Sequence, residues 1–177
     1  MKKSALIFLL IAGIMIALAI PGRTAEDAPH IAYTKHFLRN YPKRLGRALE
    51  LMPMVEGYSA INAVPTLAVS VLISVESSWK TSAQGDIGEH GLMQVHGQCA
   101  KGHDMSTPEG QIAAGTACLA AAYEACDGSL KQALTMYQSG SCTPRTKRTK
   151  RRIDYRLAII NKWSKRPHAR SDWMSEV

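Results

Sequence analysis

The chain has 177 residues, 46% hydrophobic and 20% charged, a composition that suits one compact core and excludes a second domain. Lys and Arg outnumber Asp and Glu by 22 to 14, and the resulting net charge of +8 favours anionic polymers or anionic membrane surfaces as partners. Half of the basic residues lie between Thr143 and Arg170, where Asp154 is the single acid.

The N-terminus is typical of an export signal, because Lys2 and Lys3 precede an apolar run from Ala5 to Ile20. Ala17-Leu18-Ala19 offers a cleavage site, but the run is also close to the length that spans a bilayer. We therefore expect an exported, periplasmic protein, and both cleavage of the signal and its retention as an inner-membrane anchor at residues 5–20 stay open.

Export implies an oxidising compartment, so the four cysteines are candidates for two disulfides: Cys99, Cys118, Cys126 and Cys142. Cys118 and Cys126 lie eight residues apart in one expected helix, about 12 Å along its axis, and cannot pair. If the helices around Asp127-Gly128-Ser129 are antiparallel, Cys142 returns to the level of Cys118. That arrangement favours the pairs Cys118–Cys142 and Cys99–Cys126.

Apolar spacing and helix-end residues predict a mainly helical chain. The expected helices, with a Gly- and Ser-rich loop between the second and the third, cover residues 43–58, 66–79, 107–126, 130–138 and 151–163. The helix at 66–79 is apolar on nearly every side, which is typical of a buried central helix. The expected organisation is a signal peptide or anchor at 1–20, a linker or short helix at 21–42, one catalytic domain at 43–163 and a tail at 164–177.

Glu76 is the leading catalytic candidate, since it is the only acid between Gly57 and Gln84 and ends the most apolar helix, with Trp79 three positions on. Partial desolvation there would raise the pKa of its carboxyl group, as a general acid working near neutral pH requires. The structural alternative is a helix-terminal glutamate in solvent or in a salt bridge.

Three motifs follow one another along the chain: Glu76-Ser77, then Gly91-Leu92-Met93-Gln94 across a loop, and then Met136-Tyr137-Gln138-Ser139-Gly140. They resemble the E-S, G-L-M-Q and A-Y-N-x-G elements of the soluble lytic transglycosylases, with glutamine in place of asparagine in the third. Tyr155 is similar to a later family tyrosine. The resemblance covers roughly residues 45–160, the size of one catalytic domain.

The resemblance implies a single-domain, lysozyme-like fold that cleaves the β-1,4 bond between N-acetylmuramic acid and N-acetylglucosamine in peptidoglycan. One carboxyl group, that of Glu76, would protonate the glycosidic oxygen and then accept the proton of the muramic C6 hydroxyl, which leaves a 1,6-anhydro sugar. By analogy Ser77 orients the acid, and Tyr137 hydrogen-bonds near Glu76. The remaining implied substrate-binding residues are Leu92, Met93, Gln94, Gln138 and Tyr155. Packing in the core is the structural alternative for Leu92, Met93 and Tyr137.

Two other functions stay open. Asp86 or Glu89 could position a water on the far face of the sugar, which would make the protein a hydrolytic muramidase like goose-type lysozyme. A non-catalytic wall-binding or assembly protein on the same scaffold is the rival from another class, and it requires Glu76 to be expendable.

No cofactor or metal is expected. Cys99 lies near three histidines, His90, His96 and His103, but their spacing matches no zinc motif and Cys99 has disulfide partners. The basic stretch Arg145–Arg156 predicts adhesion to an anionic wall or membrane, with a solvated face as the alternative, and export argues against nucleic acid. Small enzymes of this family serve phage particles and conjugation or secretion machinery, and the residues do not choose among these settings.

Overall fold

The computed structural model describes residues 28–166, so the export signal and the end of the tail lie outside the described residues. In the described part, the chain is helical and contains no strand beyond two isolated β-bridges. The elements are α2 (Pro29–Phe37), α3 (Pro42–Ile61), α4 (Thr66–Ser77), the 3-10 turn η2 (Gly97–Cys99), α5 (Pro108–Ala125), α6 (Leu130–Ser139) and α7 (Lys147–Ser164). This confirms a mainly α, single-domain architecture.

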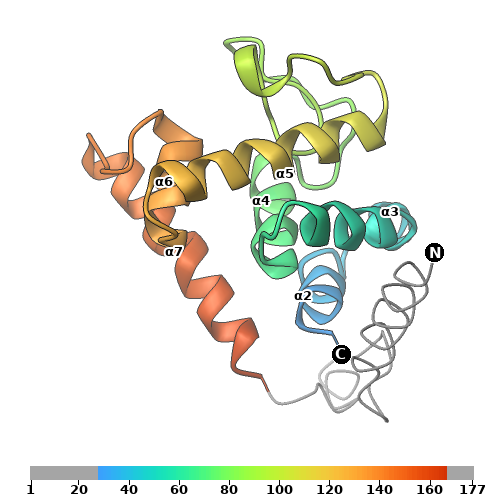
Figure 1. Cartoon of the computed structure of the whole chain (residues 1–177). Helices are drawn as coiled ribbons and strands as arrows, with labels where there is room; N and C mark the ends of the chain where they lie inside the picture. The colour runs from blue at the N-terminus through green and yellow to red at the C-terminus, as the bar shows by residue number, and fades with distance from the viewer. Residues whose placement is uncertain (1–27, 167–177) are drawn as a thin grey trace, which may run out of the picture.

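Helix α4 is the centre of the domain, as its all-round apolar sequence predicts. Helices α2, α3 and α7 pack against it, and α6 packs between α5 and α7 (Figure 1). Nine of the twelve residues of α4 are buried, whereas Glu76 in its last turn is only partly covered. The most apolar helix therefore carries one carboxyl group to the edge of the core.

The ends of α5 and α6 follow from local capping chemistry. The Thr107 side chain accepts a hydrogen bond from the Gly110 N–H at the start of α5, and Ser129 does the same for the Gln132 N–H at the start of α6. Gly140 ends α6 in the left-handed conformation. Helix α7 starts at Lys147, four residues before the predicted start, because Thr146 caps it.

Helix α4 ends at Ser77, two residues earlier than predicted. Ser78 and Trp79 both have positive φ angles, 51° and 63°, so Trp79 leaves the helix and turns into the core. Its indole N–H donates to the Ser74 hydroxyl at 3.0 Å. The prediction that this helix continues to Trp79 is therefore wrong.

Helix α2 falls in the segment predicted as a linker or short helix, and it belongs to the packed unit. Tyr33 and Leu38 are buried, and α2 contacts α3, α4 and α7. The Tyr33 ring lies 5.9 Å from the Trp163 ring near the end of α7, measured between ring centroids. The packed domain therefore starts before residue 43.

Two disulfides are formed, Cys99–Cys118 and Cys126–Cys142, so the favoured pairing was wrong although the exclusion of Cys118–Cys126 was right. Helix α6 is only ten residues long and packs at the C-terminal end of α5 instead of running back along it (Figure 1). Cys142 is consequently bonded to Cys126, which directly follows α5, and η2 lies beside the middle of α5 at Cys118.

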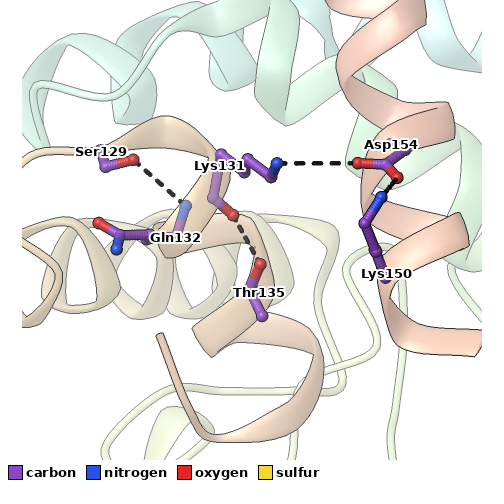
Figure 2. Close-up of polar contacts among 6 residues, drawn as sticks. All are labelled: Ser129, Lys131, Gln132, Thr135, Lys150 and Asp154. Atoms are coloured by element: carbon purple, nitrogen blue, oxygen red, sulfur yellow. Dashed lines mark hydrogen bonds and ion pairs between the residues drawn. The ribbon is translucent and has the colours of Figure 1, made fainter. Parts of the chain in front are cut away.

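Helices α6 and α7 are joined by Asp154, the one acid of the basic stretch. Its two carboxylate oxygens lie 2.5 Å from the Lys150 ammonium and 3.9 Å from the Lys131 ammonium (Figure 2). These ion pairs are exposed and contribute little stability, but they occupy Asp154. None of the helices in residues 28–166 is long and apolar enough to cross a membrane.

Candidate active site

Glu76 lies where α4 meets α7. Its side chain is 18% exposed, and the Arg156 guanidinium donates a hydrogen bond from Nη2 to Glu76 Oε1 at 2.5 Å. The two residues are 80 positions apart in the sequence. The second carboxyl oxygen, Oε2, accepts no hydrogen bond from residues 28–166. One oxygen of the carboxyl group is thus held and the other is free to meet a ligand.

Arg156 belongs to the buried face of α7, which also carries Ile153, Ile160 and Trp163. The arginine residue is 4% exposed, and its Nη1 atom is buried without a hydrogen-bond partner in the described part of the chain. An arginine in an apolar stripe is costly unless its charge is paired, so the ion pair with Glu76 accounts for its burial.

Opposing effects set the protonation of Glu76. Burial raises the pKa of its carboxyl group above the ordinary value, while the charges of Arg156 and Arg152 pull it down and the Glu89 carboxylate adds a small rise. Burial prevails, so the pKa of Glu76 is raised. A carboxyl group that is both desolvated and paired with a cation can occupy both protonation states that an acid and base must visit.

Two hollows open on either side of Glu76. Hollow 1, about 880 Å³, is walled by α5, α6 and η2, and hollow 2, about 540 Å³, by α7 and the loop of residues 85–89. The two share five lining residues, Glu76, Ile87, Glu89, Gln94 and Arg152. The two hollows are therefore neighbours, and the Glu76 carboxyl group lies where they meet.

Gly91-Leu92-Met93-Gln94 forms a tight turn that is fixed to α5. Gln111 accepts a hydrogen bond from the Leu92 N–H at 2.9 Å, and its amide donates to two backbone carbonyls. Gly91 has φ = 76°, and a Cβ atom there would lie 2.2 Å from the Gln111 side chain, so only glycine fits. The turn brings Gln94 into both hollows.

The side chain of Gln94 is itself held in place, because Nε2 donates to the carbonyls of Ala83 (3.1 Å) and Gly91 (2.8 Å). Tyr137 lies in the wall of hollow 1, and its hydroxyl donates to the Met93 carbonyl at 2.8 Å. Burial, followed by the nearby Glu76 charge, raises the pKa of Tyr137, so it stays a neutral donor. The structure thus brings Glu76, Gln94 and Tyr137 together.

The family model for the transglycosylase SLT domain matches residues 53–160, more than half of the chain. The chain belongs to this family. No curated protein matches it. The family comprises peptidoglycan lytic transglycosylases, so peptidoglycan is the substrate that membership implies, at a site outside the cytoplasm.

Within this SLT domain, three predicted site residues do not reach the cleft. Leu92 and Met93 are fully buried and line neither hollow, and Met93 packs against Gly115 of α5. Their side chains belong to the core, and the Met93 carbonyl accepts the hydrogen bond from Tyr137. The Ser77 hydroxyl donates to the Ile73 carbonyl of its own helix at 3.0 Å, and it makes no hydrogen bond to the Glu76 carboxyl group that it was expected to orient.

The other predicted residues of the SLT domain do line the cleft. Gln138, at the position of the family's asparagine, lies in the wall of hollow 1, and its amide oxygen is buried without a partner in residues 28–166. Tyr155 lies in the wall of hollow 2 and is 60% exposed. The sequence interpretation missed Arg156 and Arg152. For Arg156, its place among the apolar positions Ile153 and Ile160 could have indicated a buried charge.

A zinc site around Cys99 is incompatible with the structure, because Cys99 is bonded to Cys118. In the described part of the domain, no three His, Cys, Asp or Glu side chains are grouped so that they could hold a metal ion.

Proposed function

We propose that this SLT domain cleaves the β-1,4 bond between N-acetylmuramic acid and N-acetylglucosamine and leaves a 1,6-anhydro end on the muramic acid. The observation that carries the proposal is the placement of Glu76 at the join of two hollows, with Oε1 held by Arg156 and Oε2 unpaired. One carboxyl group suffices for this reaction, because it gives and then takes back one proton.

In the first step, protonated Glu76 donates its proton from Oε2 to the glycosidic oxygen, and the bond between that oxygen and muramic C1 breaks. The acetamido group of the substrate assists the departure, as in other substrate-assisted glycosidases. In the second step, the muramic C6 oxygen attacks C1, and the Glu76 carboxylate accepts the C6 hydroxyl proton. The enzyme returns to its starting state, and no water is consumed.

Arg156 fits a positioning role in this cycle. Its hydrogen bond to Oε1 fixes the carboxyl plane, and its charge stabilises the carboxylate that exists between the two proton transfers. The raised pKa of Glu76 supports the first step and the cation supports the second. Both properties come from burial of the pair between α4 and α7.

A second candidate function has its own observation. Asp86 and Glu89 line hollow 2 together with Glu76, and hydrogen bonds from backbone N–H groups, those of Glu89 and Ile87, lower the pKa of Glu89. An ionised carboxylate across the cleft from the acid could activate a water, as in an inverting hydrolase. The protein would then be a muramidase.

Product analysis separates the two reactions. Strands digested by the full chain, with both disulfides intact, are examined by mass spectrometry for their new muramic ends. The proposal expects anhydro ends, which are lighter than reducing ends by the mass of one water molecule. Reducing ends would establish hydrolysis instead, and an equal mixture would contradict both pure mechanisms.

The wider setting of the enzyme is also proposed. An export signal at residues 1–20 would deliver the SLT domain to the periplasm, where peptidoglycan lies. The exposed basic residues of α7 and the loop before it, such as Arg145, Lys147 and Arg148, would favour adhesion to anionic wall or membrane surfaces. Service to phage, conjugation or secretion machinery is compatible with such a small enzyme.

A further inference from the structure

Hollow 2 has two walls of opposite charge. Helix α7 contributes Arg152 and Arg156 to one wall, and the loop of residues 85–89 contributes Asp86 and Glu89 to the other. Hollow 1 receives its charged groups mainly from the residues that it shares with hollow 2. Arg152 and Glu89 line both hollows, whereas Arg156 and Asp86 line hollow 2 alone, so hollow 2 carries the larger number of charged groups.

Arg152 is the key residue of the cationic wall. It is exposed, it lines both hollows, and it makes no ion pair or hydrogen bond within residues 28–166. Asp154, the nearest acid in the sequence, does not neutralise it, because Lys150 and Lys131 occupy that carboxylate (Figure 2). Arg152 thus presents a full positive charge to whatever enters the cleft.

Arg156, in the same cationic wall, has a guanidinium N–H group without a hydrogen-bond acceptor in the described part of the chain. It is more than nine-tenths buried, it lines hollow 2, and its Nη1 atom has no partner among the described residues. A buried guanidinium N–H without an acceptor is unfavourable in the free protein.

The opposite wall holds a fixed acceptor. Glu89 Oε2 accepts a hydrogen bond from the Ile87 N–H at 3.0 Å, and the side chain folds over Gly85, where a Cβ atom would lie 2.3 Å from Oε2. Two apolar side chains that are exposed also belong to hollow 2, Ile87 at 73% and Tyr155 at 60%. The hollow therefore offers cationic, anionic and apolar surfaces to one ligand.

The sugars of the substrate do not match such a surface. N-acetylglucosamine and N-acetylmuramic acid carry hydroxyl and amide groups, and in a peptide-bearing strand the lactyl carboxyl of muramic acid is itself an amide. The charges of peptidoglycan lie on the peptide stem, which has free carboxylates, an amine on its diamino acid and the methyl groups of its alanines. Complementary charge gives specificity more than raw affinity.

Building on the proposed function, we propose that hollow 2 binds the peptide stem carried by the muramic acid next to the cut bond, with Arg152 pairing with a stem carboxylate. Arg152 is then a specificity-determining residue: it distinguishes strands that bear stems from strands that have been stripped of them. Hollow 1 takes the uncharged sugar chain on the other side of Glu76.

The kinetic test compares intact strands with strands treated by an amidase. The amidase removes each stem and leaves a free lactyl carboxylate, so the two possible sources of a carboxylate are separated. Wild-type kcat/KM is expected to be higher on stem-bearing strands, and Arg152→Gln is expected to reduce that preference about tenfold, mainly through KM. Arg148→Gln is the matched control, since Arg148 is exposed on the same helix but lines neither hollow.

Three results would overturn the inference. One is an Arg152→Gln variant that keeps the wild-type preference. Another is a larger loss on stripped strands, which would assign Arg152 to the lactyl carboxylate. The third is an equal loss in Arg148→Gln, which would mean general attraction between the basic helix and the wall.

A binding measurement keeps this test independent of the reaction. In the Glu76→Gln background, calorimetry compares a disaccharide that carries a stem with the same disaccharide without one. Arg152→Gln should weaken only the first complex, by about tenfold in Kd. If the wild-type protein cleaves no strand but this difference in Kd is seen, the proposed reaction fails and the stem site stands. If strands are cleaved but Arg152→Gln does not change the Kd, the reaction stands and the stem site fails.

Discussion

The two hollows that meet at Glu76 are built in different ways. The wall of hollow 1 at η2 is tied to α5 by the Cys99–Cys118 disulfide, and both cysteines line the hollow. The wall of hollow 2 is joined to α4 by the Arg156–Glu76 ion pair, and it carries most of the charge of the cleft. A covalent bond holds the wall of hollow 1, whereas an ion pair holds the more highly charged wall of hollow 2 and acts on the acid itself. Substitutions in the two walls should therefore have different effects on kinetics and stability.

Glu76→Gln changes the residue at which the two hollows meet, and it should cause the largest loss of activity. The amide cannot donate and accept the catalytic proton, so kcat should fall by about 1,000-fold. The substitution preserves shape and can still accept the Arg156 hydrogen bond, so the protein should fold and bind glycan strands. Release of soluble fragments from purified sacculi measures the loss.

Glu124→Gln is the matched control, because Glu124 is exposed on α5 and lines neither hollow. Wild-type rates in the Glu76 variant would remove Glu76 from the reaction and favour a binding or assembly protein.

Arg156→Gln removes the ion pair between α7 and α4, and it should cause the next largest loss of activity. Loss of the cation removes a contribution that lowers the pKa of Glu76, so this pKa rises further. Because the acid must be protonated, kcat/KM declines as pH rises through that pKa, and the declining limb should move to higher pH. The maximal rate should fall by about tenfold or more, because Oε1 is no longer held.

Arg156→Lys separates positioning from packing. Lysine keeps the charge without the planar fork, so the alkaline limb should return part of the way toward that of the wild type. Both variants should lose about 3 kcal/mol or less of unfolding free energy in urea. A loss of rate with no movement of the pH profile in either variant would mean that Arg156 only supports the packing of α7.

Sequence predicted the charged side of the cleft less well than the fold. Capping residues such as Thr107, Ser129 and Gly140 act on their own helices, so α5 and α6 could be placed to within a residue or two. Glu76 and Gln94 could be placed in one site because ordered motifs of a known family carried them. These signals are local or already encoded in a family pattern.

Arg156 and the disulfides depend on packing between distant segments. Arg156 was counted in a basic stretch; its place among the apolar positions of α7 indicates burial but not its partner, which lies 80 residues away. The disulfide pairing depends on where α6 packs along α5, which the lengths of the two helices do not determine. The family motif likewise placed Leu92 and Met93 near the site, but it did not decide between the cleft and the core for their side chains, which are buried.

The disulfide-bonded wall of hollow 1 is tested by replacing both Cys99 and Cys118 with serine. The two disulfides have similar sequence separations, 19 and 16 residues, so each should contribute about 3 kcal/mol to the free energy of unfolding. Only Cys99–Cys118 lines hollow 1, so only its removal should also raise KM, by severalfold.

The Cys126 and Cys142 double serine variant is the matched control, measured by urea unfolding and by steady-state kinetics on the same strands. Equal increases in KM for the two double variants would show that the disulfides support global stability alone, and that hollow 1 has no special need of its bond.

Tyr137→Phe should have the smallest effect, and it tests how the two sides are coupled. The tyrosine hydroxyl donates to the Met93 carbonyl, so it links α6 to the turn that presents Gln94. Phenylalanine keeps the ring but leaves a buried carbonyl unpaired, at a cost of about 1 to 2 kcal/mol in unfolding free energy. If the hydroxyl serves only this link, kcat should fall less than about tenfold and the pH profile should keep its position. A loss close to that of Glu76→Gln would instead place the Tyr137 hydroxyl in the proton transfers, and the cleft would then work with two proton-carrying groups in place of one.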